Sequence, residues 1–201
     1  MRTILFWIVV VAVTLPSSVA QEARRRVGDP FPKGDSALLH VSPAPGQVPH
    51  SLKELCNASS LIIEGTVRTT LPPREPSSRS LETDAVISVN RTLKGPATLR
   101  EIMLAQRGSF RGDLNIRPAQ YSLVQPAEQC VLFLTEDDRP KIPQAAGGLK
   151  RYLITGIWSG LFSFEGGRMR VKADEPDALR RKYQGLTLEQ VIAEIITALM
   201  P

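Results

Sequence analysis

Residues 51–67, SLKELCNASSLIIEGTV, combine a helix start, a cysteine and the beginning of a strand in one short stretch. Ser51 and Glu54 have the spacing of a capping box, in which a hydroxyl and a carboxylate accept hydrogen bonds from backbone amides at the start of a helix. We therefore expect a short helix over residues 52–58. The run Leu-Ile-Ile follows directly and predicts a strand over residues 61–69 with neighbours on both faces.

The length and composition of the chain predict one folded domain with tails. Its 201 residues suit a single domain, and the 42% of hydrophobic residues is enough for one core. Sixteen prolines argue against an all-helical fold, because each proline inside a helix costs about 3 kcal/mol. The net charge of +5 slightly favours acidic partners and does not single out nucleic acid.

Residues 1–20 have the pattern of an export signal. Arg2 supplies the positive start, residues 4–15 supply the apolar segment, and Ser-Val-Ala at residues 18–20 forms a small-residue cleavage site. The apolar run is too short to span a bilayer stably. We expect a mature chain that begins at Gln21, lies in the periplasm or outside the cell, and has no stable membrane span. An uncleaved anchor is the alternative.

Residues 21–50 show no hydrophobic period and contain five prolines, so we expect an extended arm that adds little to the core. Its three consecutive arginines, at positions 24–26, are read as a solvated charge run, with contact to an anionic surface as the alternative. His40 and His50 are the only histidines and both lie in this arm. A metal site would need ligands from a segment that is held rigidly, so none is predicted.

The rest of the chain, residues 51–201, is expected to form a single domain made mainly of strands. Residues 84–93 alternate apolar and polar side chains with the period of two of a half-buried strand, whereas residues 129–135 are almost wholly apolar. The other predicted strands cover residues 99–106, 150–158, 161–165 and 168–172. Gly166-Gly167 joins the last two as a hairpin, and residues 72–79 and 107–120 are read as loops.

A second helix is predicted over residues 188–199, capped by Thr187. Its apolar side chains fall on one stripe at helical spacing: Leu188, Val191, Ile192, Ile195, Ile196 and Leu199. We expect the stripe to pack on its own domain, with a partner surface as the alternative. Short strands in hairpin order with one late helix predict a small antiparallel barrel of about five to seven strands.

Cys56 and Cys130 are the only two cysteines. In an exported protein an even number of cysteines favours a disulfide, so we predict a bond between them. The alternative is two buried free thiols, which behave as small hydrophobic side chains.

Several motifs in this order resemble a broad set of exported bacterial proteins of unknown function. They are LKELCNASSLIIEGTV, DAVISVNRTLKG, IMLAQRG, PAEQCVLFLT and GLFSFEGGRMRV, and together they cover about residues 51–172. The pattern is similar to the barrel of tissue inhibitors of metalloproteinases, which implies an OB-type fold. Those inhibitors chelate zinc through an N-terminal cysteine, whereas Cys56 follows about 35 mature residues, so the resemblance does not carry that mechanism to this chain.

Recognisable catalytic motifs are missing from the sequence. It contains no Gly-x-Ser-x-Gly, no His-Glu-x-x-His and no phosphate loop, and no histidine lies in residues 51–201. We assign no catalytic, cofactor-binding or metal-ligating residue. The predicted function is a non-catalytic exported barrel that binds a protein or cell-envelope partner. The alternatives are a hydrolase that uses carboxylates, for which Glu136, Asp137 and Asp138 are candidates, or a protease inhibitor like those of metalloproteinases.

Three further patterns have structural or chance explanations. Basic and aromatic residues near the last strands resemble the surface by which OB-folds bind single-stranded nucleic acid: Lys150, Arg151, Trp158, Phe162, Phe164, Arg168, Arg170 and Lys172. Export argues against that ligand, so we expect a polar face over core aromatics. Arg111-Gly112-Asp113, and the glycosylation acceptor patterns at Asn57 and Asn90, are read as coincidental.

Overall fold

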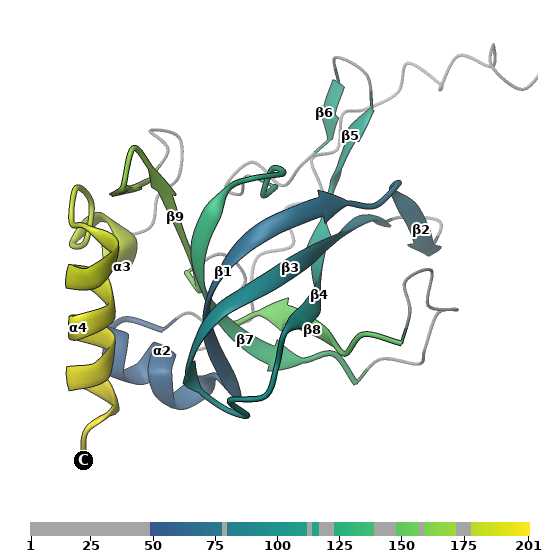
Figure 1. The fold of residues 1–201 in the computed structure, drawn as a ribbon. Helices are drawn as coiled ribbons and strands as arrows, with labels where there is room; N and C mark the ends of the chain where they lie inside the picture. The colour runs from purple at the N-terminus through teal and green to yellow at the C-terminus, as the bar shows by residue number, and fades with distance from the viewer. Residues whose placement is uncertain are drawn as a thin grey trace, which may run out of the picture. The chain divides into compact units, whose positions relative to one another are not determined.

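Pairing of the first long strand with two different neighbours closes the sheet into a barrel. β1 (Leu61–Thr70) pairs antiparallel with β3 (Ser80–Lys94) on one edge and with β7 (Gln129–Glu136) on the other. β3 pairs with β4 (Glu101–Arg107), and β4 runs parallel to β8 (Arg151–Ile154), which pairs with β7. The order β1-β3-β4-β8-β7, closed by β1, is visible in Figure 1. The predicted fold class is confirmed, and the closed five-stranded barrel is OB-like.

The computed structural model describes residues 49–77, 80–111, 114–116, 123–138, 148–156, 159–171 and 178–201. The predicted export signal, residues 21–48 of the predicted arm, Gly112 and Asp113, Trp158 and Lys172 lie outside the described residues. Within the described part, no helix has the length and apolarity needed to cross a membrane.

Alternate side chains of the barrel strands point inward and form one core. Because the side chains of a strand alternate between its two faces, Cys130, Leu132 and Leu134 of β7 enter this core while Val131 and Phe133 face outward. The barrel core consists of Leu61, Ile63, Val67, Ala85, Ile87, Ile102, Leu104, Leu123, Val124, Cys130, Leu132, Leu134, Tyr152, Ile154 and Leu161.

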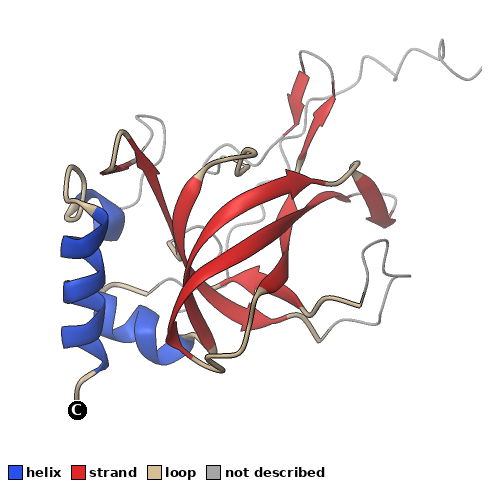
Figure 2. Cartoon of the chain, viewed as in Figure 1, coloured by secondary structure: helices blue, strands red, loops and turns tan. Residues whose placement is uncertain are grey.

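A second core lies between the outer surface of β1 and β7 and the helices. α2 (Leu52–Ala58) and α4 (Leu188–Leu199) pack against each other on this side of the barrel, and α3 (Ala178–Arg181) lies near the top of α4 (Figure 2). The helix-side core includes Ile62, Val131 and Phe133 from the barrel, and Leu55 and Cys56 from α2. Val191, Ile192 and Ile195 of α4 are buried in it, so the apolar stripe packs mainly on its own domain, as predicted. Ile196 is the exception, since 45% of it is exposed.

Both predicted helix starts are confirmed, and α2 is also held at its end. The Ser51 hydroxyl accepts a hydrogen bond from the Glu54 amide (3.1 Å), and Thr187 and Gln190 form a complete capping box on α4. Lys94, the last residue of β3, donates from Nζ to the carbonyls of Cys56 (2.8 Å) and Ser59 (2.6 Å). These carbonyls lie at the end of α2 where the helix itself supplies no donors, so Lys94 ties α2 to the barrel.

Three short strands lie where the sequence predicted loops. β2 (Arg74–Ser77) pairs with the first part of β3, and β5 (Ser109–Arg111) pairs with β6 (Leu114–Ile116) in a sheet of their own. Each is only three or four residues long. Runs this short are too brief to show a period, and their pairing partners decide their conformation.

The strand predicted over residues 150–158 ends early. β8 stops at Ile154, and β9 (Leu161–Glu165) resumes pairing along the same edge of β7 after residues 155–160. Phe133 of β7 holds both ends of this excursion, because its carbonyl accepts from the Thr155 amide and its amide donates to the Gly160 carbonyl (both 2.8 Å). The excursion lets β8 turn toward β4 and close the barrel while β9 continues outside it.

The predicted hairpin between β9 and β10 (Arg168–Arg170) is confirmed. Gly166 and Gly167 have φ values of 57° and 75°. Positive φ at both central residues is the requirement of a type I′ turn, which glycine meets without strain.

The two apolar residues Ile192 and Ile196 of α4 provide a matched test of helix packing. Ile192 is 2% exposed. Ile192→Asp would bury an unpaired charge in the helix-side core and should cost about 3–5 kcal/mol, which lowers the unfolding midpoint by roughly 10 °C. Ile196→Asp should shift the midpoint by a few degrees at most. Thermal unfolding of both variants measures the difference, and equal midpoints would show that α4 does not pack as described.

Candidate functional site

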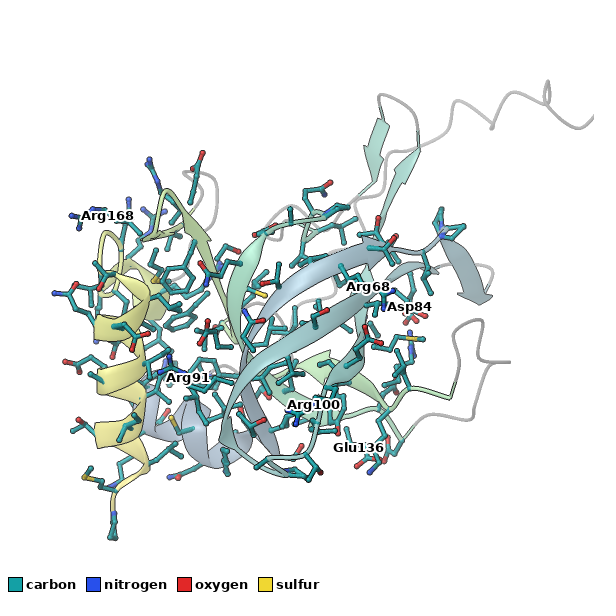
Figure 3. The ribbon with its side chains drawn as sticks, in the orientation of Figure 1. Arg68, Asp84, Arg91, Arg100, Glu136 and Arg168 are labelled. Atoms are coloured by element: carbon teal, nitrogen blue, oxygen red, sulfur yellow. The ribbon has the colours of Figure 1, made fainter. Side chains whose placement is uncertain are left out.

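One arginine gathers three carboxylates on the outer surface of the barrel. Arg151 of β8 forms ion pairs with Glu82 (2.7 Å) and Asp84 (2.8 Å) of β3, and with Asp137, which directly follows β7. The Arg151 side chain is 15% exposed, and those of Glu82 and Asp137 are 3% and 2% exposed. We call these four residues the Arg151 cluster. Figure 3 labels Asp84, which marks the place of the cluster on the barrel.

Strand register explains why these side chains meet. Asp84 lies opposite Ala105 of β4, and Ala105 lies opposite Leu153 of β8. Ala85 and Tyr152 point into the barrel core, so their neighbours Asp84 and Arg151 point outward. Because β4 lies between β3 and β8, the Arg151–Asp84 ion pair crosses the outer face of β4. Met103 and Ala105, which face outward from β4 between the two strands, carry no charge.

The cluster stabilises the charged form of its arginine. Burial alone would lower the pKa of Arg151, but hydrogen bonds to Asp84 and Glu82, together with their negative charges, hold that pKa above its usual value. Arg151 is therefore always a cation.

An apolar strip adjoins the Arg151 cluster. Val86 of β3 lies opposite Met103 of β4, which lies opposite Arg151. Val86, Met103 and Ala105, which we call the outer strip, point away from the barrel core by alternation, yet they are 6%, 2% and 4% exposed. The site is thus a buried surface across β3, β4 and β8, with charges at one side and apolar side chains beside them.

The sequence predicted only part of this site. Arg151 belongs to the basic and aromatic pattern, and Asp137 to the acidic run that was considered for a hydrolase. Glu136 of the same run is exposed and forms a 3.5 Å ion pair with Lys150. Glu82 and Asp84 were missed altogether. Their sequence signal is two acids at outward positions of one strand, and it points to Arg151 only once the strand order is known.

The predicted basic and aromatic surface is not assembled by its described members. Phe162 and Phe164 are buried in the helix-side core, where the Phe162 ring lies 5.3 Å from that of Phe133 and 5.7 Å from that of Tyr183. Arg168 is exposed on β10 beside the helices, on the opposite side of the view in Figure 3 from Asp84. Arg151 and Arg168 thus belong to different surfaces.

Both cysteines are buried and are free thiols in the structure, which corresponds to the alternative to a disulfide. Cys130 points into the barrel core, whereas Cys56 lies in the helix-side core on the other face of β7. Burial raises the pKa of both thiols; Lys94 opposes this at Cys56, and Glu128 and Glu64 add to it at Cys130. Neither thiol is placed to act as a nucleophile at neutral pH.

The carboxylates of the Arg151 cluster do not form a recognisable metal site. Among the described residues, no group of three His, Cys, Asp or Glu side chains is arranged to hold a metal ion.

Residues of the two glycosylation acceptor patterns have structural roles. Ser59 is buried and donates to the Leu55 carbonyl (2.8 Å), and Asn90 donates to Thr66 Oγ1 (3.1 Å). Arg111 ends β5, and the rest of its tripeptide lies outside the described residues.

Arg151 and Arg68 provide a matched pair for measuring the cluster. Arg151→Leu would leave three buried carboxylates without their shared cation, and we expect a loss of about 3–5 kcal/mol. Arg68→Leu removes one ion pair, to Glu101 (2.6 Å), from a side chain that is 63% exposed, and should cost less than about 1 kcal/mol. Urea unfolding of both variants gives the two free energies. A loss for Arg151→Leu as small as that for Arg68→Leu would contradict a structural role of the cluster.

The state of the cysteines can be measured directly. We expect the protein, unfolded in denaturant without reductant, to take up two alkylating groups, because Cys56 lies in the helix-side core and Cys130 in the barrel core. Intact-mass spectrometry counts the groups. A sample treated first with reductant is the control, and an untreated mass two hydrogens below the dithiol form would establish the disulfide instead.

Comparison with known proteins assigns no family to the chain. It matches no protein-family model and no curated protein. The described structure therefore establishes an OB-like barrel, and barrels of this kind serve many different functions. The function has to be argued from the surfaces of the barrel itself.

Proposed function

We propose that this protein is a non-catalytic exported barrel that binds a protein or cell-envelope partner through the strands that project from it. The observation that carries the proposal is the extension of β3. This strand has 15 residues, and its first part continues beyond its pairing with β1 to form a ribbon with β2. β5 and β6 form a second ribbon, which contacts β3. Figure 1 shows both ribbons projecting from the barrel, away from the helices.

The position of these ribbons fits a binding role. β3 and β4 are the second and third strands of the barrel, and OB-folds bind their ligands with those strands and with the loop between the first two. β2 lies in that loop, and the β5–β6 ribbon follows β4 directly. Exposed backbone edges on short ribbons can also pair with an extended segment of a partner.

The proposed export rests on residues 1–20, and it places the partner in the periplasm or outside the cell. The likeness to tissue inhibitors of metalloproteinases is proposed for the fold alone. Cys56 lies within α2 and is fully buried, so its backbone nitrogen is an internal helical amide. Zinc chelation by a terminal cysteine does not follow from that position.

A carboxylate-dependent hydrolase is the second candidate, because three carboxylates do converge in the Arg151 cluster. Such an enzyme needs one carboxyl group protonated as an acid beside an ionised one. Arg151 forms an ion pair with all three carboxylates, so their contacts set none of them apart as the acid. The cluster therefore supports a structural role better than a catalytic one.

The binding proposal can be tested with the mature chain as bait for exported proteins and envelope fragments. Replacing residues 109–116 with a short Gly-Ser turn removes the β5–β6 ribbon and should reduce capture of a specific partner at least about tenfold, with binding then measured on the purified partner. Gly166→Asn is the control, because Asn-Gly also favours a type I′ turn and lies in the β9–β10 hairpin.

Equal capture by the ribbon variant and the control, at unchanged unfolding midpoints, would contradict binding through the ribbons. Hydrolysis of an envelope polymer by the original chain, lost in a folded Asp137→Asn variant, would favour the hydrolase.

A further inference from the structure

Two exposed hydrophobic side chains lie together at the end of α4. Ile196 and Met200 are the large hydrophobic residues that remain exposed among those that the structure describes, at 45% and 58%. They are four residues apart, which places them on the same side of a helix, one turn from each other. Ala193 is also exposed and precedes Ile196 by three residues. Isolated exposed hydrophobic residues are common on proteins, whereas these three residues adjoin, and we call them the α4 strip.

The α4 strip lies on a different side of the helix from the residues that α4 buries in the helix-side core. Its members are spaced by three and then four residues, which is the spacing of a seam between two packed helices. Glu189 lies four residues before Ala193 on the same flank and forms an ion pair with Arg91 of its own chain (3.0 Å). The polar start of this flank is thus satisfied within the chain, while its apolar end stays exposed.

The order of residues along the flank fits a second copy of the same helix in antiparallel orientation. If a twofold axis passes beside Ile196, the two copies of Ile196 meet at the axis. Ala193 of each copy then lies opposite Leu199 and Met200 of the other, and a small side chain facing large ones lets the helices approach closely. Glu189 of each copy lies beyond the end of the other helix, so the two carboxylates stay apart. A parallel pair would bring these like charges together.

We propose that the α4 strip joins two copies of this chain in an antiparallel dimer with twofold symmetry. Three residues make a contact well below the area of about 800 Å² per partner that stable complexes bury, so the dimer is a weak and transient one. The proposal goes beyond the proposed binding function and is independent of it. The ribbons project from the barrel away from the helices, so a dimer formed through α4 leaves the ribbons of both copies uncovered (Figure 1).

Cysteine crosslinking tests the antiparallel arrangement in the mature chain. Ile196→Cys places one thiol of each copy at the proposed axis, so copper phenanthroline, an oxidant, should link two copies through a disulfide. Glu194→Cys is the control, because Glu194 is exposed on the same helix but lies two residues away, near the opposite side. The dimer should form at least about tenfold faster through position 196, since association raises the local concentration of that thiol alone.

The unsubstituted chain, in which both native cysteines are buried, is the blank for this experiment. Non-reducing electrophoresis measures the linked dimer. Equal rates at positions 194 and 196, or no linkage at position 196, would overturn the proposal.

Sedimentation equilibrium tests the association itself over a range of protein concentrations. The unsubstituted chain should show a reversible equilibrium between monomer and dimer. Ile196→Asp should weaken it at least about tenfold, because two carboxylates would then meet at the axis. Glu194→Gln should leave it unchanged. A chain that is monomeric at every concentration, or a dimer that Ile196→Asp does not weaken, would contradict the proposal and leave the α4 strip to a different partner.

Discussion

The pairing of β1 with β7 is the interaction on which the rest of the structure depends. It joins the first and fourth barrel strands along six consecutive residue pairs and removes the free edges that an open sheet would expose. Closure also gives every strand an inside and an outside. Cys130 and Val131 are neighbours in sequence, yet one packs in the barrel core and the other under the helices, because only alternate positions can face the axis.

Once the barrel is closed, other segments have to be held against its outer surface, and basic side chains of the strands make several of these contacts. Lys94 holds the end of α2 through two carbonyls. Arg91, labelled in Figure 3, contacts Glu64 of β1 (3.3 Å) and Glu189 of α4 (3.0 Å). The Glu189 contact is exposed and contributes at most about 1 kcal/mol, so it orients α4 more than it stabilises it. Arg151 differs because its partners are buried, and its loss would remove the cation that all three carboxylates contact.

Local patterns in the sequence predict what local chemistry determines. Capping predicts where the two helices start, at Ser51 and Thr187. Alternation predicts the long strands, and the preference of glycine for positive φ predicts the turn at Gly166-Gly167. Each of these signals lies within a few residues. The Arg151 cluster depends instead on β3, β4 and β8 lying side by side in register, and β4 and β8 are distant in sequence. The disulfide was predicted from export and from the number of cysteines. Neither observation shows on which side of β7 each thiol lies.

The arrangement of charges and apolar side chains on β3 and β4 also constrains how a partner would be bound. OB-folds commonly bind ligands on the outer face of these strands. Here the Arg151 cluster fills one part of that face with internal ion pairs, and the outer strip is already buried. Binding there would require breaking ion pairs that are shielded from water, at a cost of several kcal/mol before any contact forms. The β2–β3 and β5–β6 ribbons require no such rearrangement, because their strands extend past the barrel. A partner that approaches this side therefore meets the ribbons first, which is why the proposed binding surface is placed on them rather than on the face of the barrel.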